Sequence, residues 1–158
     1  MISEKDKRNR FISINRKARY NYHISDKYEA GIILLGSEVK SLRMGHGSLA
    51  ESYAQEESGE IWIRNFHISD YQPATIVKHE PVRPRKLLLK KKEIGRILGA
   101  IKKQGMTIIP LSVYFNGRGI AKLEIGIAKG KKLYDKRQDI KSRDWQKNKA
   151  RILRAKNN

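Results

Sequence analysis

The chain has 158 residues and a mass of 18.3 kDa, the size of one domain or of one domain with a tail. It contains no cysteine, which excludes disulfides and thiolate chemistry, and no apolar run approaches the roughly 18 residues of a membrane-spanning helix. Lysine and arginine outnumber aspartate and glutamate by 35 to 16, and the resulting charge of +19 favours a polyanionic partner, above all nucleic acid. The first ten residues lack the apolar stretch of a signal peptide, so we expect a cytoplasmic protein.

The apolar residues and the charges divide the chain into three parts. Residues 15–128 hold 31 of the 39 Leu, Ile, Val and Phe residues, enough for one small core, whereas residues 129–158 carry a net charge of +9. We therefore expect a flexible basic arm over residues 1–14, a globular body over residues 15–128 and a basic tail over residues 129–158. The tail has too few apolar residues to hold a helix alone, and is expected to be disordered until it binds a partner.

The first predicted elements of the body lie between residues 26 and 43. Asp26 followed by Glu29 fits a capping box, so a short helix is expected to run to about Leu35 and to end at Gly36. The next segment, Ser37–Arg43, is predicted to be extended.

The middle of the body is predicted to contain a hairpin, a loop and a long helix. Residues 52–55 and 61–66 are predicted strands joined by a turn. Residues 72–86 contain three prolines and are predicted to form a loop. Residues 90–104 repeat apolar side chains at helical spacing, which predicts an amphipathic helix that ends at Gly105.

The last predicted element of the body is a second hairpin. Residues 111–115 and 123–127 alternate apolar and polar side chains on either side of the turn Asn116-Gly117. Several antiparallel strands with one long helix favour a mainly β, α+β fold, with a small closed β-barrel rather than a parallel sheet.

The sequence has no enzyme signature. Residues 45–50 match the dinucleotide fingerprint G-x-G-x-x-G/A, but a strand is expected where that site needs a helix, so this segment is interpreted as a connection between strands. The four histidines are scattered and have no cysteine beside them, which argues against a zinc site. We predict no catalytic residue, metal ligand or cofactor. Single carboxylates such as Glu29, Glu38 and Asp70 leave a metal-dependent ribonuclease as an alternative.

Two basic segments of the body have the composition of an RNA-binding surface. Residues 15–23 interleave basic side chains with aromatic rings. This mixture suits the binding of phosphates and the stacking of nucleobases, although a first strand with a basic flank has the same composition. Residues 83–92 place six positive charges at the start of the predicted helix, where the helix dipole disfavours cations and an external anion is implied. The candidates in these segments are Arg16, Lys17, Arg19, Tyr22, Arg83, Arg85, Lys86, Lys90 and Lys91.

The tail begins with further candidates for RNA binding. These are Lys129, Lys131 and Lys132. If the following residues became helical, four basic side chains would form one stripe along the helix: Arg143, Lys147, Arg151 and Arg154.

The order of several motifs resembles the SsrA-binding protein family, also known as small protein B. The motifs that carry the resemblance lie at residues 15–19, 28–31, 36–43, 85–89 and 126–132, with Asp135-Lys136-Arg137 after them, and the match runs from residue 15 to 153. The resemblance implies an OB-like barrel with about three flanking helices. It implies a protein that binds the tRNA-like domain of transfer-messenger RNA and delivers it to stalled ribosomes for trans-translation, catalysing no bond change.

The resemblance also implies site residues. Asn15, Glu29 and Leu87 with its neighbours match positions tied to transfer-messenger RNA binding, and the matched motif at residues 36–43 adds Lys40 and Arg43. In the family the tail enters the decoding centre and the mRNA channel. The matching tail residues here are Tyr134, Asp135, Lys136, Arg137, Trp145, Ile152 and Leu153. Some members carry histidine in place of Tyr134, and a phenol can stack on a base but cannot be a cation near pH 7.

The implied partners are transfer-messenger RNA and the ribosomal RNA of the small subunit, with no membrane and no small-molecule substrate. Composition alone leaves a ribosomal or general OB-type RNA-binding protein as the first alternative.

Overall fold

The computed structural model describes residues 9–71 and 78–157, and only the backbone of residues 133–135. Its elements, in chain order, are β1 (Arg10–Ile14), α2 (Lys17–Asn21), β2 (Tyr22–Ile32), α3 (Gly36–Arg43), β3 (Gly47–Ser48), β4 (Tyr53–Glu57), β5 (Glu60–Arg64), β6 (His67–Ile68), β7 (Arg85–Leu88), α4 (Lys91–Gln104), β8 (Thr107–Phe115), β9 (Ala121–Gly130) and α5 (Leu133–Lys156).

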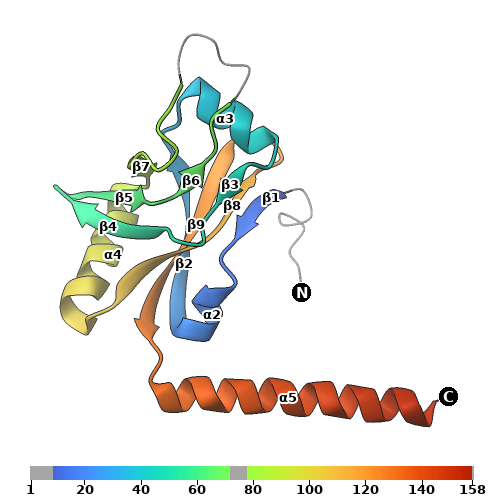
Figure 1. The fold of residues 1–158 in the computed structure, drawn as a ribbon. Helices are drawn as coiled ribbons and strands as arrows, with labels where there is room; N and C mark the ends of the chain where they lie inside the picture. The colour runs from blue at the N-terminus through green and yellow to red at the C-terminus, as the bar shows by residue number, and fades with distance from the viewer. Residues whose placement is uncertain (1–8, 72–77, 158) are drawn as a thin grey trace.

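A seven-stranded antiparallel sheet forms the body (Figure 1). Its strand order is β1-β8-β9-β2-β7-β5-β4, and β3 and β6 form a small second sheet. The large sheet curves until β4 contacts β8, but among the described residues the edge strands β1 and β4 do not pair with each other. The mainly antiparallel α+β fold is therefore confirmed. The closed barrel is not, because the sheet stays open.

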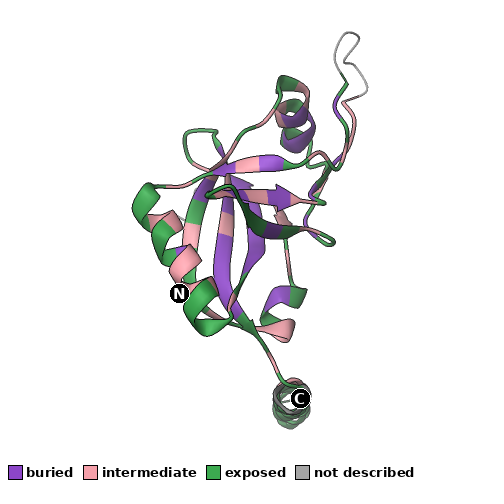
Figure 2. Ribbon diagram, turned by 90° about the vertical axis from the view of Figure 1, so that its left-hand side faces the viewer, coloured by how far each residue is buried: buried purple, intermediate pink, exposed green. Residues whose placement is uncertain are grey.

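The core lies on the concave face of this sheet (Figure 2). Ala30, Val113 and Leu123 point inward from neighbouring strands and are fully buried. Helix α4 closes one side with the apolar stripe that the sequence predicts, centred on the buried Ile97. Gly105 ends α4 in the left-handed conformation at φ 60°, which glycine adopts without a steric penalty.

A second, smaller core lies on the convex face of the sheet, under α2. Ala18 packs there against Leu111 and Ala128, with Tyr22 and Ile24 at its margin. Gly126 leaves the necessary space, because a Cβ at that position would lie 3.0 Å from Ile24 Cγ2 and 3.1 Å from Leu111 Cδ1. This packing fixes α2 on the outside of the sheet.

Two neighbouring elements were predicted wrongly, and each has the structure expected of the other. Residues 26–35 do not form a helix, because 22–32 are strand β2, which pairs along almost its whole length with β9. The segment Gly36–Arg43 is not extended but forms helix α3, which buries Glu38, Ser41 and Leu42 at helical spacing. A carboxylate does cap a helix here: Glu38 Oε1 accepts a hydrogen bond of 2.8 Å from the backbone N–H of Leu35.

Two further predictions need correction, and two are confirmed. The expected arm at residues 1–14 includes Arg10–Ile14, which form the edge strand β1, while residues 1–8 lie outside the described part of the chain. The predicted loop at residues 72–86 ends in strand β7, which begins at Arg85 and joins β2 to β5; residues 72–77 are not described. Both predicted hairpins, β4–β5 and β8–β9, are confirmed.

The tail, expected to be disordered when free, forms the 24-residue helix α5, which projects from the body (Figure 1). Lys, Arg, Gln and Ala, which dominate this segment, are good helix formers. Contacts with α2 hold its first turns. Its later residues, from Ile140 onward, are exposed in the structure.

Candidate RNA interface

The convex face of strands β1, β8, β9 and β2, which we name the outer face, is hollowed into a cleft beside α2. The cleft has a volume of about 470 Å³. Its lining combines exposed apolar groups with cations and is formed by Phe11, Ile14, Asn15, Arg16, Arg19, Lys27, Leu111, Ser112 and Glu124. Three residues of the first predicted basic segment, Asn15, Arg16 and Arg19, are therefore brought to one site.

Asn15 holds the connection between β1 and α2 in place at the edge of this cleft. Its backbone N–H donates a hydrogen bond of 2.8 Å to the carbonyl of Leu111, and its side-chain Nδ2 donates one of 2.9 Å to the carbonyl of Pro110. Ala18 then packs inward, so Arg16 and Arg19 are left exposed on the solvent side of α2. Lys17 is exposed on the same helix, whereas Tyr22 is half-buried in the small core.

Glu29 offers a fixed carboxylate on the outer face. It lies on β2 opposite Glu124 of β9, its side chain is exposed, and the hydroxyl of Tyr114 donates a hydrogen bond to its Oε2. It does not cap a helix, which corrects the interpretation of Asp26 and Glu29 as a capping box. An exposed carboxylate fixed in this way can accept hydrogen bonds from the N–H groups of a nucleic-acid base.

Two apolar side chains border this carboxylate region. Phe11, which is 44% exposed, lies with its ring centroid 5.4 Å from that of Tyr114 and offers a stacking surface for a base. Leu88 lies opposite Gly31 at the junction of β7 and β2 and is 52% exposed.

Leu88, not Leu87, is the leucine available to a ligand. Leu87 is fully buried in the main core, because successive residues of strand β7 point to opposite faces of the sheet. The prediction that Leu87 itself is an RNA-binding residue is therefore wrong for its side chain. The signal that could have identified Leu88 is this alternation, but the predicted loop at residues 72–86 covers the first half of β7 and hides it.

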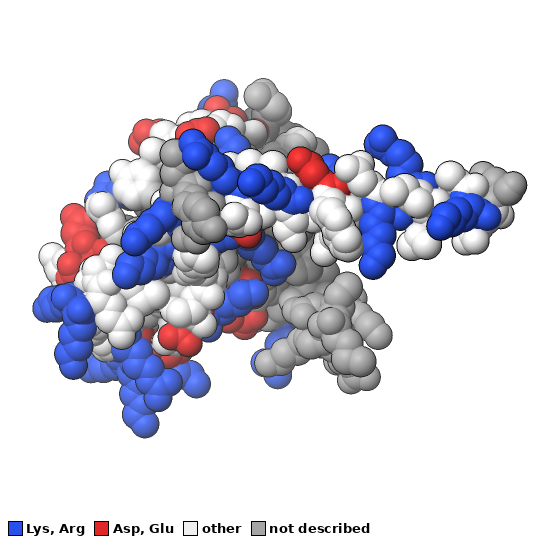
Figure 3. All heavy atoms as spheres, turned by 90° about the horizontal axis from the view of Figure 1, so that it is seen from below, with Lys and Arg blue, Asp and Glu red and all other residues white. Residues whose placement is uncertain are grey.

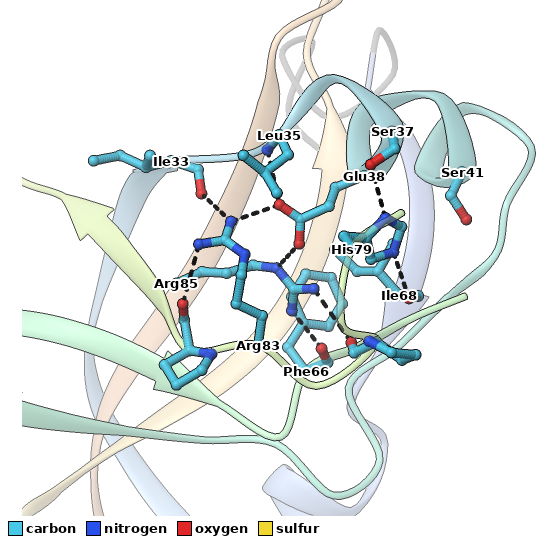
Figure 4. Close-up of polar contacts among 12 residues, drawn as sticks. Ile33, Leu35, Ser37, Glu38, Ser41, Phe66, Ile68, His79, Arg83 and Arg85 are labelled. Atoms are coloured by element: carbon cyan, nitrogen blue, oxygen red, sulfur yellow. Dashed lines mark hydrogen bonds and ion pairs between the residues drawn. The ribbon is translucent and has the colours of Figure 1, made fainter. Parts of the chain in front are cut away.

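The basic residues of the second predicted segment, residues 83–92, differ in how far they are buried. Arg85 is fully buried and forms an ion pair with Oε2 of the equally buried Glu38 (Figure 4). Its Nη1 donates a hydrogen bond of 2.5 Å to the carbonyl of Phe66, and its Nη2 donates one of 3.2 Å to the carbonyl of Pro81. Arg83 binds Glu38 Oε1 from the protein surface, at 2.6 Å.

This network, which we name the Glu38 cluster (Glu38, Arg83 and Arg85), is structural. Burial alone would raise the pKa of Glu38, but hydrogen bonds from Arg83 and from the Leu35 N–H, with the charge of Arg85, outweigh burial and lower this pKa below its usual value. Burial lowers the pKa of Arg85. The prediction that Arg85 binds RNA is therefore wrong, because its guanidinium is enclosed and all its contacts are within the protein.

The remaining predicted cations of the body are at the surface. Lys86 is on the same face of β7 as Leu88, and its Nζ lies 3.6 Å from Glu60. Lys90 and Lys91 are exposed where α4 begins, where the Glu93 carboxylate accepts a hydrogen bond of 3.2 Å from the Lys90 N–H. The last two predicted cations, Lys40 and Arg43, are on α3. Arg43 is exposed, and the Nζ of Lys40 lies 5.6 Å from the ring centre of Tyr71.

The tail carries its cations away from the body (Figure 3). Lys and Arg side chains project along α5 in this view from below. Lys129 and Lys132 are exposed, whereas Lys131 forms an ion pair with Asp139. Lys136, Arg137, Trp145, Ile152 and Leu153 are on α5, and the last three are more than half exposed. The side chains of Tyr134 and Asp135 lie outside what the structure describes.

The described residues contain neither a candidate metal site nor a candidate membrane span. No group of three or more His, Asp or Glu residues there is placed to hold a metal ion. No helix in the described ranges has the length and apolar character needed to cross a membrane.

Comparison with known proteins identifies the family. The family model described as "SmpB protein" matches residues 12–155. The SsrA-binding protein of Rhizobium johnstonii is 56% identical over 147 residues, which cover 93% of this chain and 97% of that protein. The SsrA-binding protein of Afipia carboxidovorans is 51% identical over 156 residues, 99% of each chain.

A solved structure supports the same assignment. It is described as "tmRNA-SmpB: a journey to the center of the bacterial ribosome", and it is similar to this chain with a TM-score of 0.62 and 47% identity, covering 76% of this chain and 84% of the other. Similarity of sequence along nearly the whole chain and similarity of fold agree, and the chain belongs to the SmpB family of SsrA-binding proteins.

Proposed function

We propose that this protein binds the tRNA-like domain of transfer-messenger RNA with its outer face and delivers that RNA to stalled ribosomes for trans-translation, in the cytoplasm. The single observation that carries the proposal is the cleft beside α2, which is lined by cations and an exposed aromatic ring. The fixed Glu29 carboxylate lies further along the same face. The relatives that share the family are named for binding SsrA, and the similar solved structure is described as a complex of transfer-messenger RNA with SmpB.

On the outer face, different kinds of side chain make different contacts with the RNA. Arg16, Lys17 and Arg19 bind phosphates, which supplies affinity and positions the RNA without reading its sequence. Glu29 accepts hydrogen bonds from base N–H groups, and Phe11 stacks on a base, which supplies selectivity for an exposed loop of folded RNA.

A second region extends this surface across β7 toward α4. Lys86 and Leu88 share the outer face with Glu29, and Lys90 and Lys91 follow at the start of α4. We propose that Leu88 packs against a ribose or base while these lysines bind the adjoining phosphates. Lys40 and Arg43 on α3 are assigned to the flanking phosphates of the same RNA.

In this proposal the tail binds the ribosome. Lys129, Lys131 and Lys132 lead from the sheet into α5, and the tail enters the vacant decoding centre and mRNA channel. The residues assigned to contacts there are Tyr134, Asp135, Lys136, Arg137, Trp145, Ile152 and Leu153. The exposure of the last three is consistent with this role, because apolar side chains left uncovered by the body are available to a partner.

The test separates body from tail. Binding is measured by competition between transfer-messenger RNA and bulk tRNA at fixed salt, and tagging is measured on stalled ribosomes. Deleting the residues after Lys132 should leave the preference for transfer-messenger RNA intact and abolish tagging. Loss of RNA binding by orders of magnitude, or tagging by the truncated protein, contradicts the proposal.

The two alternatives predict other outcomes. A general RNA-binding protein shows no preference between the two RNAs and loses affinity in proportion to the charge removed. A metal-dependent ribonuclease cleaves RNA during incubation with Mg²⁺, which gel electrophoresis of the RNA detects directly.

A further inference from the structure

One row of residues across three strands lines the cleft beside α2. The sheet register places Ile14 of β1 opposite Ser112 of β8, and Ser112 opposite Glu124 of β9. Residues directly opposite each other in antiparallel strands lie on the same face, with their Cβ atoms about 4.5–5.5 Å apart. The cleft, at about 470 Å³, has the size of a pocket that holds a small molecule or one nucleotide. An apolar group, a hydroxyl and a carboxylate therefore lie side by side along its wall.

The hydroxyl of Ser112 is buried without a partner in the described part of the chain. Ser112 is only 6% exposed, and no hydrogen bond among residues 9–71 and 78–157 involves this hydroxyl. The large majority of buried side-chain polar atoms in proteins are hydrogen-bonded. Because Ser112 lines the cleft and its O–H group can rotate, it is placed to donate a hydrogen bond to an acceptor on a bound ligand.

The carboxylate of Glu124 is surrounded by cations but is opposite another carboxylate. Glu124 pairs in register with Glu29 of β2, and like charges directly opposite each other destabilise a sheet. The Nζ of Lys27 lies 3.8 Å from Glu124 Oε1, and both side chains keep part of their surface exposed. A carboxylate repels phosphates and accepts hydrogen bonds from N–H groups. In an RNA ligand, Glu124 therefore favours the edge of a base, while Arg16 and Arg19 on α2 favour the phosphates.

The order of polar groups along the row matches one nucleobase. The Ser112 hydroxyl is a donor, and beside it the Glu124 carboxylate offers two acceptors. The Watson–Crick edge of guanine presents the complementary order, with the O6 acceptor followed by the N1–H and N2–H donors. Adenine and cytosine each present a single donor group beside an acceptor, and uracil presents one N–H between two carbonyls. Guanine is therefore the base that satisfies all three groups of the protein.

We propose that the cleft takes one unstacked guanine nucleotide of an RNA loop and that Glu124 is the residue that selects guanine. Glu124 accepts hydrogen bonds from N1–H and N2–H, and Ser112 donates one to O6. Phe11 and Ile14, which are 44% and 54% exposed, contact the faces of the base. This inference deepens the proposed function and rests on it, because it names the base that the outer face reads.

Short single-stranded RNAs test the choice of base with the unaltered full chain. The probes are fluorescent heptauridylates whose central residue is guanosine, inosine or adenosine, and fluorescence anisotropy at low salt gives their dissociation constants. The guanosine probe should bind about tenfold more tightly than the adenosine probe, as expected for one bidentate contact. Inosine, which lacks the N2 amino group, should bind with intermediate affinity. Equal affinities for guanosine and adenosine, or no binding of any probe, overturn the proposal.

Two variants test the two polar groups separately. Glu124→Gln replaces one acceptor by a donor, so the guanosine preference should disappear and adenosine, whose N1 and N6–H₂ suit an amide, should bind at least as well. Ser112→Ala should weaken guanosine and inosine alike, because both bases carry O6. Thermal melting verifies that each variant is folded. A folded Glu124→Gln protein that still prefers guanosine overturns the proposal.

A matched control separates base selection from charge. Glu51→Gln removes the same charge from an exposed position outside the cleft lining, and the ratio of guanosine to adenosine affinity should not change. If Glu51→Gln and Glu124→Gln change this ratio equally, Glu124 does not select the base and the proposal is rejected.

Competition between transfer-messenger RNA and bulk tRNA on the same samples keeps this inference distinct from the proposed function. A preference for transfer-messenger RNA without a preference for the guanosine probe rejects the inference and leaves the proposed function standing. A preference for the guanosine probe without one for transfer-messenger RNA supports guanine selection in the cleft and contradicts the proposed function.

Discussion

Two groups of charges in this protein have similar composition and opposite roles. In the Glu38 cluster the carboxylate is buried, and two arginines, one buried and one half-buried, both form ion pairs with it. On the outer face a carboxylate, Glu29, and two arginines, Arg16 and Arg19, are exposed and separate. The first group ties α3 to β7 and to the segment before it, and the second group is directed toward solvent.

The difference shows that positive charge in the sequence does not by itself mark a binding surface. Both arginine-containing segments have the composition of an RNA site. Strand alternation and one buried carboxylate remove Arg85 from the surface, while one buried alanine, Ala18, leaves the arginines of α2 outside. The following experiments test this division of roles.

The largest effect is expected from Glu38→Gln, on stability. The substitution leaves the buried Arg85 guanidinium without its counter-charge, and breaking a buried ion pair costs about 3–5 kcal/mol of unfolding free energy. Urea denaturation measures it. The control is Glu57→Gln, which removes a surface pair with Arg64 and should change stability by less than about 1 kcal/mol. Equal effects of the two substitutions contradict the structural role of the Glu38 cluster.

Glu29→Ala should act mainly on RNA binding. Hydrogen bonds to a charged group contribute about 1.5–3 kcal/mol, so affinity for transfer-messenger RNA should fall roughly ten- to a hundredfold. Thermal stability should fall less than affinity, because Glu29 is exposed in a strand, does not cap a helix and loses within the protein only the hydrogen bond from the Tyr114 hydroxyl. Melting and binding are measured on one sample, and a large loss of stability with unchanged affinity rejects the assignment of Glu29 to RNA.

Substituting Arg16 and Arg19 together by glutamine should weaken the salt dependence of RNA binding. Each phosphate contact contributes roughly one unit to the slope of log K against log[salt], so the slope should become shallower by about two units. Filter binding over a salt series gives the slope. The matched control is Arg118→Gln, on the turn between β8 and β9 and outside the cleft lining. An equal loss per charge from Arg118 indicates attraction without a defined site.

The smallest effect is expected from mild acid. The pKa of Glu38 lies below its usual value of 4.5, so its carboxylate stays charged down to that pH and its contribution to stability is lost only as the pH falls through the lowered pKa. The difference in unfolding free energy between the unaltered protein and Glu38→Gln should be constant from pH 7 to about 4.5 and shrink below. A difference that shrinks already between pH 7 and 5 shows that this pKa is not lowered.

The parts of the fold that could be predicted from sequence are those set by local patterns. The apolar stripe of α4, its glycine stop and the Asn116-Gly117 turn are local signals, and the structure follows them. The neighbouring elements β2 and α3 were interchanged because a helix-capping pattern near Asp26 outweighed a weaker period-two pattern. In that pattern Tyr28, Ala30 and Ile32 point toward the core while Lys27 and Glu29 point outward. Pairing with β9, remote in sequence, decides the outcome.

The residues of the candidate site also differ in whether local sequence signals could identify them. Arg16 and Arg19 could be selected from composition, and the structure leaves both at the surface. Phe11 and Tyr114 were not selected, because the exposure of Phe11 and the contact of Tyr114 with Glu29 depend on strand register across the sheet. Leu88 was included only as a neighbour of Leu87, through the resemblance. Arg85 was selected wrongly, since nothing local indicates that Glu38, forty-seven residues earlier, reaches it.

The open sheet has a consequence for how copies of this protein meet. Its edge strand β4 leaves one side without a strand partner among the described residues, and an exposed edge of this kind is a template for pairing between molecules. Strand β4 ends in Glu56 and Glu57, both exposed. Pairing of two such edges would place these charged side chains in the contact, with little apolar surface gained in return. We expect light scattering to show monomers at low ionic strength, and substituting both glutamates with threonine to promote association.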